Sequence, residues 1–144
     1  MDNHLTALAH AATVAARLLQ DHPDLPRVVG INLRPLLVSD DVEVEIALQL
    51  SPDSDLTGVA TAVTNWARTL DCTVSFSVAD TFTQIAAQTR IDGHAMQVWN
   101  HLTPADTATV FTGLGLPAPT RGTHVEISPS ALLRTITTTP AAVA

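Results

Sequence analysis

The chain has 144 residues, of which 46% are hydrophobic, so we expect one domain with a core of its own. The formal charge is −7, and every basic residue is an arginine. A chain this acidic repels phosphate backbones, so we expect no nucleic-acid binding. The absence of lysine and the abundance of Ala, Thr and Val are typical of a bacterial genome rich in G and C.

The sequence shows neither the pattern of a signal peptide nor that of a membrane-spanning helix. Its N-terminus lacks a basic region followed by an apolar run, and no apolar stretch reaches the roughly 18 residues of a membrane helix. Cys72 is the only cysteine, so no disulfide forms within the chain, and we expect its thiol to be buried as a small hydrophobic group. These features predict a cytoplasmic protein.

The first predicted element is a helix over residues 3–20, followed by Pro23 and Pro26, which end it. Helical spacing places one set of residues on an apolar face and another on a polar face. The apolar set is Leu5, Leu8, Ala12, Ala15 and Leu19, and the polar set is Thr6, His10, Thr13, Arg17 and Gln20.

A hairpin is predicted next, because apolar residues alternate over residues 29–33 and 42–50. A two-residue turn at Asp40-Asp41 would pair Leu33 with Leu48 and Ile31 with Leu50, which puts the apolar sets on one face. Pro35 has no N–H to donate, so the first strand is predicted to be an edge strand or to be bulged there.

The second predicted helix covers residues 55–70 and begins after a turn and cap segment, residues 51–55. Its apolar stripe is the clearest pattern in the chain, and Trp66 belongs to that stripe, so we expect its ring in the core. The stripe consists of Leu56, Val59, Ala60, Val63, Trp66, Ala67 and Leu70.

Three strands in a meander are predicted from residue 74 onward, over residues 74–78, 82–91 and the segment after Asp92-Gly93. Asp-Gly favours a type I′ hairpin turn, because glycine tolerates positive φ. This turn pairs Ala87 with Val98 and Thr89 with Met96, so the apolar face continues.

The C-terminal third carries weaker signals. Thr103 and Pro104 are typical of a helix start, so a short helix to about residue 112 is expected. After a loop, residues 123–127 predict a short strand, and Ser128-Pro129 predicts the cap of a last helix. We therefore expect a single domain over residues 1–136 and a disordered tail over residues 137–144.

These elements predict an α+β fold: a two-layer, mostly antiparallel sheet of five or six strands with helices on one face, in the order α-β-β-α-β-β-β-α-β-α. The opposite sheet face would then be open, and it would be polar with one large exception, Trp99. Its residues are Asn32, Arg34, Glu43, Glu45, Gln49, Ser75, Ser77, Gln84, Gln88, Arg90, Gln97, Trp99 and His101. An alternative is that the C-terminal segment covers Trp99, through Phe111 or Leu114.

No motif for catalysis or for a cofactor is present in the sequence. The histidines do not have zinc-site spacing, since His94 and His101 fall on opposite faces of one strand and His4 and His10 point apart on their helix. There is no nucleophile elbow and no glycine-rich phosphate loop. We therefore expect no metal, no cofactor and no catalytic residue.

The open face is the candidate binding site, and we assign it to Trp99, His101, Gln88, Gln97, Glu45 and Arg34. A large exposed aromatic ring is typical of an interface. The preferred interpretation is a non-enzymatic binding or adaptor module that acts on a protein partner or as a homodimer. The alternative is a small-ligand binding protein or small acid/base enzyme that uses Glu45, Trp99 and His101.

Overall fold

The computed structural model describes residues 3–38, 41–52 and 55–138. These residues form four helices and six strands in the order expected from the sequence. The elements are α1 (Asn3–Asp21), β1 (Val28–Val38), β2 (Asp41–Leu50), α2 (Leu56–Leu70), β3 (Val74–Val78), β4 (Thr83–Ile91), β5 (His94–Leu102), α3 (Pro104–Leu114), β6 (His124–Ile127) and α4 (Pro129–Thr138).

The described strands form a single mixed sheet in the order β1-β2-β5-β4-β3-β6. All neighbouring pairs are antiparallel except β2 and β5, which are parallel, with Ile46 beside Met96 and Leu48 beside Val98. The expected α+β class with a mostly antiparallel sheet is therefore confirmed. The parallel pairing of β2 with β5 was not predicted, because local sequence patterns do not reveal it.

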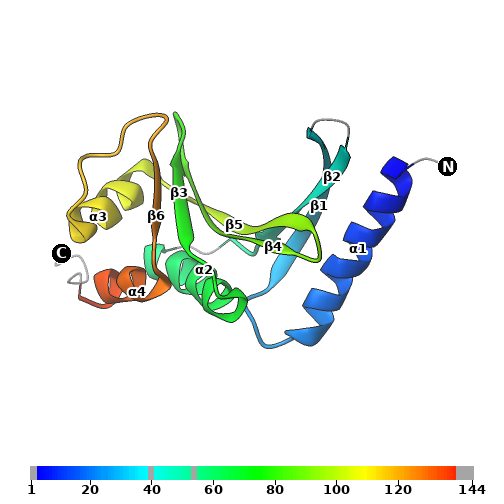
Figure 1. The fold of residues 1–144 in the computed structure, drawn as a ribbon. Coiled ribbons are helices and arrows are strands. Elements are labelled where there is room, and N and C mark those ends of the chain that lie inside the picture. Colours follow the sequence, from blue (N-terminus) through cyan, green and yellow to red (C-terminus); the bar gives the residue numbers. More distant parts are fainter. Residues whose placement is uncertain (1–2, 39–40, 53–54, 139–144) are drawn as a thin grey trace.

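The sheet is strongly curved, and the helices lie on its convex side (Figure 1). α1 packs on β1 and β2, α2 packs on β3, β4 and β5, and α4 packs on α2. None of the described segments covers the concave side, which carries the polar face expected from the sequence (Figure 1).

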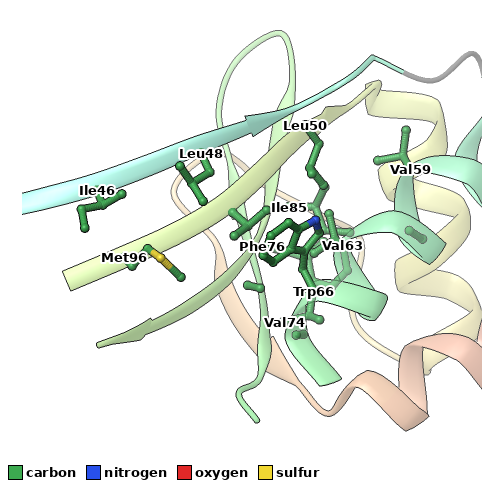
Figure 2. Close-up of a cluster of buried hydrophobic side chains, with 14 of the residues drawn as sticks. Ile46, Leu48, Leu50, Val59, Val63, Trp66, Val74, Phe76, Ile85 and Met96 are labelled. Atoms are coloured by element: carbon green, nitrogen blue, oxygen red, sulfur yellow. The ribbon is translucent and has the colours of Figure 1, made fainter. Parts of the chain in front are cut away.

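Trp66 of α2 lies in the core, as its position in the apolar stripe predicted. Its side chain is 1% exposed, and its Nε1 donates a hydrogen bond to the carbonyl oxygen of Pro26 at 2.9 Å. Figure 2 shows the indole ring among Leu50, Val63 and Ile85. Because the ring's polar atom has a partner, this large side chain is buried without leaving a donor unsatisfied.

The β4–β5 hairpin has the predicted register, with Ala87 opposite Val98 and Thr89 opposite Met96. Asp92 and Gly93 in its turn have φ angles of 49° and 85°, as a type I′ turn requires. This register places Trp99 on the concave face.

The first hairpin has a different register from the one predicted. Leu33 pairs with Ile46 and Ile31 pairs with Leu48, which is a shift of two residues along β2. A shift of two keeps every side chain on its face, so the apolar pattern could not distinguish the two registers. Val38 pairs with Asp41, whereas Asp40 of the predicted turn lies outside the described residues.

β1 is an edge strand, as Pro35 predicted, but its irregularity lies between Val28 and Gly30 rather than at the proline. α1 also differs from the prediction, because its buried face is rotated. Its buried residues are Ala11, Val14, Ala15 and Leu18, while Leu5 is 63% exposed. Ala11, Val14 and Leu18 lie beside the predicted apolar face on the helix surface, so the sequence allows more than one stripe.

The C-terminal helices lie on the helical side of the sheet. Phe111 of α3 contacts Phe76 of β3 edge to face, with ring centroids 5.9 Å apart, and both are in the core. Phe111 therefore lies on the side of the sheet opposite Trp99, and Leu114 packs against the same core. α4 runs to Thr138, two residues into the predicted tail, and residues 139–144 lie outside the description.

Candidate functional site

The candidate site on the concave face is centred on β5, where Trp99 and His101 follow one another on the same side of the strand. The ladder places Trp99 between Gln49 of β2 and Ala86 of β4, and it places His101 beside Gln84. Gln97 and Gln88 are direct cross-strand partners. Four of the six residues assigned from the sequence, Trp99, His101, Gln88 and Gln97, thus lie together on neighbouring strands.

Three rings form a continuous aromatic row along this face. The ring centroids of Trp99 and His101 are 4.8 Å apart, and those of His101 and Phe82 are 4.3 Å apart. Phe82 lies between β3 and β4 and is 37% exposed. We define Trp99, His101 and Phe82 as the aromatic row.

Phe82 was not among the residues assigned from the sequence, which counted it as the first residue of a strand. The strand begins one residue later, at Thr83, so Phe82 is free of the strand's inward and outward alternation. The available signal was a large apolar residue directly after the Asp80-Thr81 turn.

Small side chains form the floor beside Trp99. Ala47 is 7% exposed, Ala86 is 1% exposed and Ser75 is 2% exposed, although none of the described helices covers this face. Larger neighbours on the curved sheet must therefore exclude water from them. Trp99 itself is half-buried, which fits a ring that lies partly over this floor.

Glutamines border the aromatic row with uncharged hydrogen-bonding groups. The amide of Gln84 donates from Nε2 to Oε1 of Gln97 at 3.2 Å. Gln88 beside them is exposed. The centre of the face is consequently polar but uncharged.

Two ion pairs lie on this face, at the end near the first hairpin. Arg34 Nη2 donates to Glu45 Oε1 at 2.9 Å. Arg90 Nη1 lies 2.7 Å from Glu43 Oε1, a charge contact without hydrogen-bond geometry that leaves this buried oxygen without a hydrogen bond. Both guanidinium groups are largely exposed, so these pairs contribute little to stability.

Glu45 and His101 do not form one site. Glu45 lines a small cavity of about 240 Å³ with Gln88, Ala95 and Gln97, whereas His101 lies six residues further along β5 than Ala95. Six residues of extended strand span roughly 20 Å. The structure therefore separates the two groups on which the acid/base alternative depends.

Burial lowers the pKa of His101 below its ordinary value. Desolvation is the cause, because it disfavours the charged imidazolium. The lowered pKa favours the neutral imidazole, which presents an uncharged surface together with Trp99 and Phe82.

A larger cavity of about 430 Å³ adjoins the aromatic row through Phe82. Its wall is mostly apolar and is formed by the β3–β4 connection, the start of α3 and the loop before β6. Two of the residues that line this cavity, Arg121 and Asp80, form an ion pair, with 3.1 Å between Nε and Oδ1.

Comparison with known proteins does not identify the chain. No protein-family model, curated protein or solved structure matches it. Among the described helices, none is long and apolar enough to cross a membrane. The site must accordingly be interpreted from its own geometry.

Two histidines that the sequence analysis did not connect are in contact outside this face. Nδ1 of His10 on α1 lies 2.7 Å from Nε2 of His94 on β5. The helical pattern assigned His10 to the polar face, and the side chain is indeed exposed, but the rotation of α1 also brings its ring to His94. His94 and His101 do lie on opposite faces, as expected, since His94 is 7% exposed on the helical side.

Proposed function

We propose that this chain is a non-enzymatic binding module that holds a protein partner on the concave face of its sheet. The observation that carries this proposal is the aromatic row of Trp99, His101 and Phe82 on a face that the described helices leave uncovered. Partly exposed aromatic rings surrounded by uncharged polar groups are typical of the centre of a protein interface.

Charge distribution supports the same proposal. Arg34 and Arg90 on the face each contact a glutamate, so the face around the aromatic row carries little net charge, although the chain carries a net charge of −7 and Glu126 lies at the β6 edge of the same face. A patch with little net charge lets this acidic protein contact a partner without charge repulsion between the two touching surfaces. Amides of Gln84, Gln88 and Gln97 supply hydrogen bonds that fix the orientation of the partner.

The curvature of the sheet favours a convex partner over a second copy of this chain. Two concave faces meet only at their rims and leave a gap between them, whereas a helix or a turn of a partner fits into the hollow (Figure 1).

Strand addition at the sheet edge is a less suitable mode of binding. Two features of β1 hinder the pairing of another strand with its free edge. One is the irregularity between Val28 and Gly30, and the other is Pro35, which has no N–H to donate. Bulges and prolines are devices that prevent pairing at exposed edges. The proposal therefore concerns the face of the sheet and not the β1 edge.

An enzymatic role has less support in the site. Glu45, the carboxylate expected to act with His101, is held by Arg34 and lies roughly 20 Å away along the strands. A general acid and base must reach the same substrate.

Native mass measurement of the protein purified from its own host tests the proposal. We expect a complex with a second protein, and we expect Trp99→Ala to reduce the fraction in complex at least tenfold. Leu5→Ala is the matched control, because Leu5 is an exposed apolar residue on the helical side. A purely monomeric mass, or equal loss of the complex in both variants, would contradict the proposal.

A further inference from the structure

His10 and His94 join helix α1 to the sheet at a point away from the concave face. The two rings come from α1 and from the first residue of β5, with centroids 4.9 Å apart and planes inclined by 41°. Only Nδ1 of His10 and Nε2 of His94 approach each other, at 2.7 Å. Two imidazole nitrogens from separate elements thus face each other across this short contact.

The backbone fixes the protonation of His94. Its Nδ1 lies 3.2 Å from the carbonyl oxygen of Val44, and a carbonyl only accepts, so Nδ1 carries the proton. In the neutral ring, Nε2 then carries a lone pair that is directed at His10. A backbone carbonyl that orients a histidine in this way is the usual support of a metal-ligating histidine.

We propose that His10 and His94 form a two-imidazole site for a divalent transition metal ion, with Zn²⁺ as the representative ion. Binding moves the His10 proton from Nδ1 to Nε2 through solvent, so both facing nitrogens present lone pairs to the ion. This proposal departs from the expectation that the chain binds no metal, which rested on sequence spacing and did not bring His10 near His94.

Metal binding requires a movement of the His10 ring. Zinc–nitrogen bonds of about 2.0–2.1 Å with tetrahedral angles need the two nitrogens about 3.3 Å apart. The gap therefore opens by about 0.6 Å from its present 2.7 Å, and the His10 ring turns so that Nδ1 points at the ion rather than at Nε2 of His94. His94 is buried and held by Val44, whereas His10 is exposed, so His10 makes the adjustment and leaves access for water ligands.

The site has two protein ligands, because no group of three or more potential ligand side chains converges in the described residues. Water completes the coordination, and we expect binding weaker than that of structural zinc sites with four protein ligands. Its consequence is a cross-link between α1 and the strands β2 and β5, since His10, His94 and Val44 belong to these three elements.

Zinc chloride titration of the purified chain tests this site by thermal unfolding and calorimetry. We expect one equivalent to bind and to raise Tm by about 3–5 °C, reversibly with a chelator. His10→Ala, which removes an exposed side chain, abolishes both effects, while His4→Ala on the same helix retains them. In ¹⁵N NMR spectra of the imidazoles, zinc shifts His10 and His94 together.

An absence of any zinc response in the unaltered chain would overturn the site, as would an equal response in His10→Ala. If zinc does not change the Tm of the unaltered chain, and His10→Ala only lowers the Tm measured without zinc, the two histidines form a hydrogen-bonded pair and no metal site. Because the test uses the chain and zinc alone, its outcome is independent of the proposed protein partner.

Discussion

The imidazole of His101 lies against the indole of Trp99, with ring centroids 4.8 Å apart and planes inclined by 39°. The two residues are next-but-one neighbours on β5, so strand geometry places them on the same face. Phe82 also contacts His101, with ring centroids 4.3 Å apart, and extends the contact to a third ring. One short segment of strand and one loop residue thus create the main aromatic surface on the concave face.

Trp66→Ala should lower the free energy of unfolding by about 3–5 kcal/mol, because it leaves a large cavity in the core. The indole is 1% exposed and its Nε1 has a hydrogen bond to Pro26. Urea denaturation measures the loss. A loss below about 1 kcal/mol would mean that α2 does not pack on the sheet as described.

Trp99→Ala should cost less, below about 2 kcal/mol, because this ring is only half-buried. In a Trp66→Phe background, the remaining emission reports Trp99 alone. We expect this emission to be partly red-shifted in the isolated chain and to move to the blue when the partner is added. An emission that is already blue and does not respond to the partner, together with a large stability loss, would identify Trp99 as a core residue.

Much of this architecture follows from local sequence. The cap at Asp55, the stripe that contains Trp66 and the Asp92-Gly93 turn each act within a few residues, and they place α2 and the β4–β5 hairpin correctly. The concave-face position of Trp99 then follows from the parity of its strand.

The remaining features depend on tertiary contacts that leave no local trace. The parallel pairing of Ile46 with Met96 joins strands that are distant in sequence, and no periodicity encodes it. The two-residue shift of the first hairpin preserves its pattern, so the pattern fitted both registers. Phe82 joins the aromatic row, and His10 meets His94, only because separate elements come together.

His101 should make stability depend on pH in the mildly acidic range. Burial lowers its pKa in the folded state, so the unfolded chain binds more protons between that lowered pKa and the ordinary value of about 6.5. Stability is therefore lost as the pH falls below about 6.5. We expect the Tm of His101→Gln to fall less between pH 7.5 and pH 5 than the Tm of the unaltered chain. His4→Gln is the control, and its Tm should fall as much as that of the unaltered chain. Equal losses in all three proteins would contradict this assignment.

The Cys72 thiol should react slowly at neutral pH. Burial raises its pKa, and the neighbouring carboxylate of Asp71 raises it further, so little thiolate is present. Cys72 is half-buried rather than fully buried as expected from the sequence. Alkylation by iodoacetamide at pH 7 should be slower than that of glutathione and should accelerate toward higher pH, and a faster reaction would contradict the raised pKa.

Site-specific photo-crosslinking in the native host tests the central claim most directly. A photoreactive residue at Gln88, exposed on the concave face, is compared with one at Ala16, exposed on α1. The proposed function predicts a discrete crosslinked product with another protein from position 88, its loss in the Trp99→Ala background, and no such product from position 16. Equal crosslinking from both positions, or a product from position 88 that persists without Trp99, would contradict it.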